Sequence, residues 1–398
     1  MAHHVLLVPG FFGFANLGDI AYFLHVRDLL AEVGPAAGLD GEVHAVHTVP
    51  TASIRRRAAR LAEAIIETLD AHGGEVTLIG HSSGGLDARL VVTPEVSLPT
   101  QADVERAARA VRSVITVSAP HHGTPVAHLF NSLLGQQLLK LLSLSTIYTL
   151  RAGRLPIGVV LRLAGFIVGL ARRNAPPSGV LEQVFRQLLA DFSADRRAVI
   201  EHFFESVGKD QDLLAQITPA GMDVFEASTS DRESVRYGCV VSRARPPGLR
   251  SALRAGFDPY AQATHALYVA LYRLAAGTPR LHAARITREQ AATLTRAYGT
   301  RVDRRANDGM VPSLSQVRGE VIHAAWADHL DVIGHFGEPR HVPPHLDWLV
   351  SGSGFTRPQF EDLWCDVAGW AGGARAAPGR KLGERRAALR RPAAGPTP

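Results

Sequence analysis

Cysteine and lysine are scarce in this chain. Only two cysteines, Cys239 and Cys365, occur among 398 residues, too few and too far apart for a disulfide framework or a thiolate metal motif. Lysine occurs three times against 40 arginines, a bias that we attribute to a GC-rich genome. The start MAHHVLLVPG has no basic residue and only four consecutive apolar residues before a proline. Because a secretory signal needs basic residues followed by a longer apolar run, we expect a cytoplasmic protein.

An excess of positive charge is missing from most of the chain. The net charge is +6, and the segment 372–398, with seven basic residues and one acidic residue, accounts for all of it. This segment is rich in Ala, Pro, Arg and Gly and has almost no large apolar side chains, so we expect it to be disordered. Non-specific anion binding is the alternative. With the remaining charges balanced, we expect no specific nucleic-acid partner.

Strand-like and helix-like segments alternate through the first third of the chain. The strand-like segments are VLLV, GEVHAVHTV, VTLI and VRSVITV, and helix-like segments cover 20–33 and 53–71. Such alternation predicts an α/β fold with a mainly parallel sheet and helices on both faces. Strand-like text returns at SVRYGCVVS and GEVIHAAW.

The alternation is interrupted by a long helical and apolar stretch, which includes LFNSLLGQQLLKLLSL and VLEQVFRQLLADF. We interpret it as an insertion into the α/β core. The predicted organisation is a core of residues 1–126 and 222–350, an inserted helical cap or lid at 127–221, a C-terminal helix at 351–371 and the disordered basic tail at 372–398.

The stretch VTLIGHSSGG, from Val76 to Gly85, indicates a catalytic serine. A strand followed at once by G-x-S-x-G and a helix is the arrangement that presents a nucleophilic hydroxyl. The turn is so sharp that side chains two positions either side of the nucleophile collide, which explains glycine at positions 80 and 84. The spacing therefore selects Ser82 as the nucleophile, with Ser83 as the residue after it.

A serine hydroxyl needs a base and a group that orients the base. Asp308, in an Asn-Asp-Gly turn, and His329, after the strand-like VIHAAW, follow Ser82 in the chain order typical of α/β-hydrolases. Two other histidines lie close by: His323 falls inside the predicted strand and His335 lies well past its end. We favour His329 because catalytic loops converge at the carboxyl ends of parallel strands.

Two backbone amides are candidates to stabilise an oxyanion. The N–H of Ser83 lies at the N-terminus of the helix after the nucleophile, where unpaired amides favour negative charge. The second candidate is the N–H of Phe11 in PGFFGF, where Gly10 lets the chain turn. The alternative for PGFFGF is an ordinary strand-to-helix loop.

Five motifs in order, LLVPGFFGF, LIGHSSGGLDAR, SAPHHGTPVA, NDGMVP and DHLDVI, resemble those of bacterial triacylglycerol lipases, specifically the calcium-containing true lipases of the α/β-hydrolase fold. The resemblance covers roughly residues 3–130 and 215–335. Pro9 replaces the family's histidine before Gly10, and Ser83 replaces its glutamine or histidine. The resemblance implies a nucleophile, acid, base and two oxyanion donors at Ser82, Asp308, His329, Phe11 and Ser83.

The resemblance also implies a calcium site that includes Asp331, two residues after the proposed base. The second carboxylate of that family lies in a Leu-Asp-Pro stretch, for which this chain offers Asp258 in GFDPY. Carboxylate and carbonyl oxygens suit calcium, and the ion would hold the loop that carries His329. The alternative is that Asp331 pairs locally and that Asp258 belongs to a turn. No cofactor is required for the chemistry itself.

The predicted function is hydrolysis of carboxylic esters of lipids through an acyl-enzyme. Acyl transfer to an alcohol by the same residues, and a non-catalytic lipid-binding protein with this fold, are the alternatives. The cap should act as a lid that contacts a lipid interface transiently, because the run from 155 to 171 is apolar around most of its circumference. The sequence does not indicate an oligomeric state. One predicted lid helix carries an apolar face formed by Leu133, Leu134, Leu138, Leu141 and Leu142.

Overall fold

The computed structural model describes residues 2–11, 22–23, 25–130, 179–209, 212–277, 286–337 and 349–374, with isolated residues at 141, 144, 148, 156–159, 161–162, 165 and 347. Most of the predicted lid helices, including four of the five leucines of the apolar face, therefore lie outside the described residues. Leu141 is described and is buried. Of the predicted disordered tail, residues 375–398 also lie outside the described residues.

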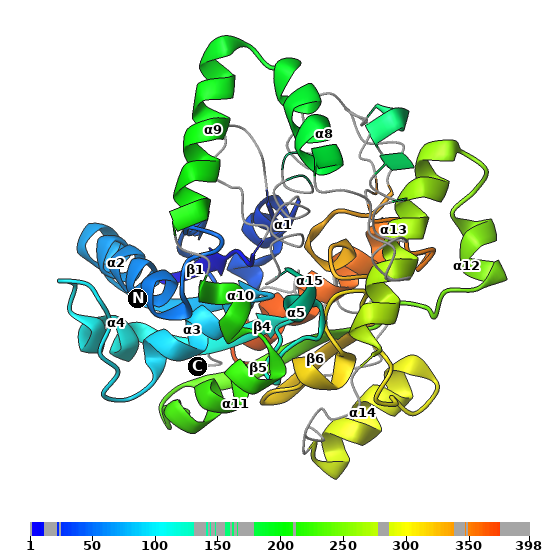
Figure 1. Ribbon diagram of the computed structural model, residues 1–398. Coiled ribbons are helices and arrows are strands. Elements are labelled where there is room, and N and C mark those ends of the chain that lie inside the picture. Colours follow the sequence, from blue (N-terminus) through cyan, green and yellow to red (C-terminus); the bar gives the residue numbers. More distant parts are fainter. Residues whose placement is uncertain are drawn as a thin grey trace.

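Within the described residues, six strands form one parallel sheet in the order β2-β1-β3-β4-β5-β6 (Figure 1). This confirms the predicted parallel sheet. The central strands are apolar runs, as in VITV and LLV, because parallel strands are buried on both faces. The strands are β1 His3–Val8, β2 Val43–Ala45, β3 Glu75–His81, β4 Val111–Val117, β5 Arg236–Ser242 and β6 Glu320–Ala325.

Helices cover the sheet. α2 (Ile54–His72), α3 (Gly84–Val92) and α4 (Val104–Ala110) pack on one another and α3 packs on β3, whereas α1 (Val26–Val33) packs against α15 (Arg357–Ala371). α2 begins after the predicted residue because the Ser53 side chain accepts a hydrogen bond from the Arg56 N–H. α1 begins later than predicted because His25 has a left-handed backbone conformation, with a φ of 60°, which interrupts a right-handed helix.

The other described helices follow β4 in the chain, and among them α14 packs against β6. α8 and α9 extend away from the sheet, whereas α10 packs against α5 and α11 (Figure 1). None of the helices that the structure describes is long and apolar enough to span a bilayer. These elements are α5 Val126–Phe130, α8 Gly179–Ala190, α9 Ala194–Lys209, α10 Asp212–Gln216, α11 Pro219–Ser228, α12 Leu249–Arg254, α13 Pro259–Ala275 and α14 Arg288–Tyr298, with short 3-10 turns η1 Pro35–Ala37, η2 Ser313–Gln316 and η3 Asp331–Ile333.

Candidate active site

Ser82 lies in a strained turn between β3 and α3, which is the predicted strand-turn-helix arrangement. Its φ is +54°, a conformation that a non-glycine residue adopts rarely. The turn leaves no room for side chains beside it, because a Cβ added to Gly80 would collide with the Gly84 backbone and one added to Gly84 would collide with the Val8 carbonyl oxygen. The glycine spacing in the sequence thus reflects steric necessity.

Asp308 and His329 are hydrogen-bonded to each other at the carboxyl ends of the late strands. The His329 Nδ1 lies 2.8 Å from the Asp308 Oδ2, and the His329 backbone N–H donates to the Asp308 carbonyl oxygen at 3.0 Å. Both side chains are buried. With Nδ1 donating to the carboxylate, the Nε2 atom of the ring is left as a proton acceptor.

The Asp308 carboxylate is held by four further donors. The backbone N–H groups of Met310 and Val311 donate to Oδ1 at 2.9 and 2.7 Å. The Ser242 hydroxyl, at the end of β5, and the Gln316 side-chain amide donate to Oδ2 at 2.8 and 3.0 Å. Sequence reasoning missed Ser242 and Gln316, because no local pattern marks a residue whose role is to orient a distant carboxylate.

The two alternative histidines have other partners. His323, in β6, is hydrogen-bonded through Nδ1 to Asp366 of α15 at 2.8 Å. The His335 Nε2 is hydrogen-bonded to the backbone carbonyl of Tyr22 at 2.9 Å. Of the three histidines considered in the sequence, His329 is therefore the one that pairs with Asp308.

The loop after β1, which holds the oxyanion candidate Phe11, lies directly against the serine turn. A Cβ added to Gly10 would lie 2.6 Å from the Cβ of Ser82, so glycine is required for this approach. Phe11 follows Gly10 and lines the same pocket as Ser82 and His329. Ser83 precedes α3 at its N-cap position, and its hydroxyl is buried and has no hydrogen-bond partner among the residues that the structure describes.

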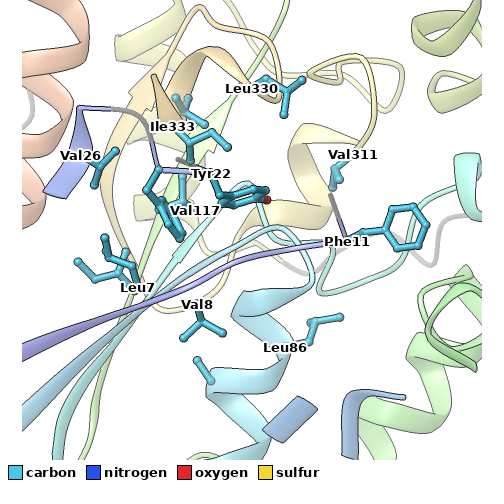
Figure 2. Close-up of a cluster of buried hydrophobic side chains, with 14 of the residues drawn as sticks. Leu7, Val8, Phe11, Tyr22, Val26, Leu86, Val117, Val311, Leu330 and Ile333 are labelled. Atoms are coloured by element: carbon cyan, nitrogen blue, oxygen red, sulfur yellow. The ribbon is translucent and has the colours of Figure 1, made fainter. Parts of the chain in front are cut away.

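A buried hydrogen-bond chain connects the β1 loop with the loop of the proposed base. The Gly10 N–H donates to the Tyr22 hydroxyl at 3.0 Å, and this hydroxyl lies 2.6 Å from the His81 Nδ1. The His81 Nε2 lies 2.9 Å from the carbonyl oxygen of His329. Because a carbonyl only accepts, Nε2 carries the proton of a neutral His81 and the Tyr22 hydroxyl donates to Nδ1. Figure 2 shows Tyr22 among the buried side chains around this loop.

The charge state of His81 predicts a pH dependence of stability. Burial, and next the nearby His329, lower the pKa of His81 well below its usual value. In the unfolded chain His81 takes up a proton near pH 6.5, whereas in the folded protein it does not. The free energy of unfolding therefore falls as the pH drops below about 6.5. We expect the change His81→Gln to reduce this dependence by about 1.4 kcal/mol per pH unit.

Chemical denaturation of both proteins from about pH 7 to about pH 5 measures this difference. Titration of the other groups, including Asp87, is common to both proteins and cancels in the comparison. If the free energy of unfolding changes with pH by the same slope in the two proteins, His81 is protonated equally in the folded and unfolded states.

A buried ion pair also contacts the β1 loop. The Arg57 guanidinium, on α2, donates to the Asp87 carboxylate of α3 at 2.9 Å and to the Pro9 carbonyl at 2.6 Å. Both side chains are fully buried, and burial raises the pKa of Asp87 to about 6 although Arg57 opposes this shift. Since Pro9 directly precedes Gly10, the pair holds the β1 loop against the helix that follows Ser82.

Ser82 and His329 open onto an apolar pocket. Its walls come from the β1 loop, the segment after β4, helices α5 and α10 and the turn after Asp308. Apart from Ser82, His329 and Thr124, the lining is aliphatic or aromatic, which suits an acyl chain. The lining residues are Phe11, Ser82, Pro120, Thr124, Val126, Ala127, Phe130, Leu214, Ile217, Met310, Val311 and His329.

Three carboxylates, those of Asp328, Asp331 and Asp347, gather next to His329, with oxygens within 4.8 Å of one another. The Asp328 Oδ2 is buried and has no hydrogen-bond partner within the described part of the chain. Burial raises the pKa of Asp328 to about 6, and burial with repulsion from Asp328 raises the pKa of Asp331 well above its usual value. Oxygen ligands of this kind fit a divalent cation such as calcium.

Of the two carboxylates predicted for a calcium site, Asp331 is in this group, together with Asp328 and Asp347. The Asp258 side chain accepts a hydrogen bond from the Ala261 N–H at 3.0 Å and caps the N-terminus of α13. The signal for Asp328 was present in the sequence, because it immediately precedes His329.

The sequence matches no protein-family model and no curated protein. Several solved structures are similar in fold. Lipase 1 from Pelosinus fermentans matches with a TM-score of 0.51 and 16% identity over 92% of this chain and 98% of that chain. Staphylococcus hyicus lipase matches with a TM-score of 0.50 and 13% identity, covering 93% and 95%. A metagenomic carboxyl esterase matches with a TM-score of 0.50 and 16% identity, covering 92% and 75%. Together with the parallel sheet, these similarities show that the chain has the α/β-hydrolase fold.

Proposed function

We propose that this protein is a serine hydrolase that cleaves carboxylic esters of lipids through an acyl-enzyme on Ser82. The observation that carries the proposal is that Ser82 and His329 line one apolar pocket, while His329 is hydrogen-bonded to the buried Asp308. The lipases and the esterase that share the fold support ester hydrolysis as the reaction class.

In the proposed reaction the Ser82 hydroxyl attacks the ester carbonyl carbon and its proton passes to the His329 Nε2. The backbone N–H groups of Phe11 and Ser83 stabilise the oxyanion of the tetrahedral intermediate. When that intermediate collapses, the C–O bond breaks and the alcohol leaves with the proton from His329. Water then attacks the acyl-enzyme by the reverse sequence and releases the carboxylic acid. Asp308 holds the imidazole ring and stabilises its charged form throughout.

Fluorophosphonate labelling and an ester screen test the proposal. We expect the wild-type protein to be labelled and to hydrolyse p-nitrophenyl esters, with medium or long acyl chains preferred because the pocket is apolar. If the cap acts as a lid, turnover should rise once a long-chain ester forms an emulsion, whereas acetyl esters should show no such rise. Folded protein that takes no label would support a non-catalytic lipid-binding protein. Ester formation from an added alcohol in excess over hydrolysis would identify an acyltransferase.

We also propose that Asp328, Asp331 and Asp347 hold a structural calcium ion. The two positive charges of the ion would offset most of the negative charge of the three carboxylates, and the ion would fix the loop that carries His329 without taking part in the chemistry. Calcium at about 100 times its Kd is then expected to raise the free energy of unfolding by about 2.7 kcal/mol. Thermal denaturation after chelation and after calcium readdition measures this effect.

Two matched variants test which carboxylates bind calcium. We expect Asp331→Asn to abolish the response to calcium. Asp258→Asn should keep it, because asparagine caps a helix as well as aspartate does. If chelation and calcium readdition change neither the melting temperature nor the activity of the wild-type protein, the site is absent.

A further inference from the structure

Helix α12 and the residue Phe257 present large apolar side chains to solvent. The exposed fractions are 77% for Leu249, 56% for Leu253 and 89% for Phe257. Leu249 and Leu253 are four positions apart and lie on one side of α12, which ends at Arg254. Phe257 follows this end, after Gly256 with a φ of +79°. Ser251 and Ala255 are buried instead. This helix therefore turns small residues inward and large apolar residues outward, the reverse of an ordinary surface helix.

The orientation of α12 is imposed by tight packing on the C-terminal segment. A Cβ added to Gly352 would lie 2.7 Å from the carbonyl oxygen of Ser251, so there is no space for a leucine on the inner side. The Ser251 hydroxyl donates to the Gly248 carbonyl at 2.8 Å and accepts from the Gly248 N–H at 2.9 Å, which fixes the start of the helix. These contacts hold α12 with its large apolar side chains directed to solvent.

Positive charge accompanies this apolar face. Arg250 and Arg254 are exposed on the same short helix. The next acidic residue along the chain, Asp258, is engaged in capping α13. Apolar side chains flanked by arginines are complementary to a surface with an apolar interior and anionic headgroups.

The location of α12 suits contact with such a surface. It follows β5, whose last residue, Ser242, is hydrogen-bonded to Asp308. α12 therefore lies toward the carboxyl end of the sheet, as the candidate active site does. In Figure 1 it lies at the outer edge of the molecule beside α13.

We infer that Leu249, Leu253 and Phe257, with Arg250 and Arg254, form a docking site for an anionic lipid surface. Three side chains on so short an element cannot supply the roughly 800 Å² per partner that stable protein interfaces bury. A lipid interface accepts separate apolar side chains without such an area. The inference rests on the proposed function for its lipid substrate, but docking itself requires no turnover.

Vesicle cosedimentation of the full chain carrying Ser82→Ala tests docking without hydrolysis. We expect binding to vesicles of phosphatidylcholine with phosphatidylglycerol, and a loss of at least about tenfold in affinity when Leu249, Leu253 and Phe257 are replaced by serine. Val224→Ser is the matched control, because Val224 on α11 is 69% exposed and lies outside the docking site. It should bind as the parent does.

A second variant tests the charge. Arg250→Gln with Arg254→Gln should reduce binding to anionic vesicles toward the level measured with phosphatidylcholine alone. Neither set of changes should lower the melting temperature or, with Ser82 restored, hydrolysis of a soluble acetyl ester.

Unchanged vesicle binding by the triple serine variant overturns the inference. The inference is also overturned if the parent protein is a dimer in solution and the triple serine variant is a monomer that still binds vesicles. A second copy of the chain would then cover this face. Failure of the proposed function has a different signature: absence of fluorophosphonate labelling with vesicle binding intact.

Discussion

Replacing Ser82 with alanine is expected to lower kcat for a p-nitrophenyl ester by about 10⁶-fold and to abolish fluorophosphonate labelling. The physical reason is that no other hydroxyl can form the acyl-enzyme from this position. Ser82 is held at φ +54° in the turn before α3 and lines the pocket together with His329. Steady-state kinetics with active-site titration of the wild type measure the effect.

Ser83→Ala is the matched control, because the two serines are adjacent and only one should react. The Ser83 hydroxyl is buried, and no described residue forms a hydrogen bond with it. Its proposed contribution is the backbone N–H, which alanine keeps, so labelling should persist and kcat should stay close to the wild-type value. A Ser83→Ala protein that loses labelling while Ser82→Ala retains it would reverse the assignment of the nucleophile.

Replacing Asp308 with asparagine is expected to lower kcat by about 10⁴-fold without preventing folding. The Asp308 carboxylate accepts from His329, Ser242 and Gln316 through Oδ2. An amide at this position either turns an N–H toward the donors or accepts from them without a negative charge. In both cases the imidazolium that forms during the reaction loses its stabilising partner, and the ring can adopt the wrong tautomer.

Asp303→Asn serves as the control for Asp308→Asn, since Asp303 lies in the same connection and its side chain accepts from the backbone N–H groups of Arg305 and Ala306. Asparagine can accept the same bonds, so kcat should not change. The test is to measure kcat for both variants and to verify their folding by circular dichroism. An Asp308→Asn protein with wild-type turnover would remove Asp308 from the proposed mechanism.

Some elements could be predicted because their causes are local. The helix expected over 53–71 is observed as Ile54–His72, since its N-cap serine and its apolar periodicity both lie within the segment. The strand expected at GEVHAVHTV is limited to Val43–Ala45. β2 is at the edge of the sheet and pairs only with β1 among the described strands, and a strand's length depends on the partner it pairs with.

Two sets of contacts at the candidate site could not be predicted from any local sequence pattern. Ser242 is 66 residues from Asp308, and His81 is 248 residues from the His329 carbonyl that it contacts. His81 stands inside the serine motif, yet nothing in that motif indicates that its ring joins Tyr22 to the loop of the proposed base. Such contacts form only after the sheet has brought its carboxyl ends together.

The parallel sheet and the position of the sharp turn at Ser82 could be predicted from the sequence alone, because hydrophobic alternation and glycine clearance act between residues close in the chain. The side chains that surround Asp308 and the carboxylates that gather beside His329 come together only in the folded protein. Asp258 and Asp328 are equally plausible metal ligands by residue type. The structure separates them because one caps α13 while the other is folded into the buried group with Asp331 and Asp347. Proximity of this kind arises from packing of whole elements, which short-range sequence patterns do not encode.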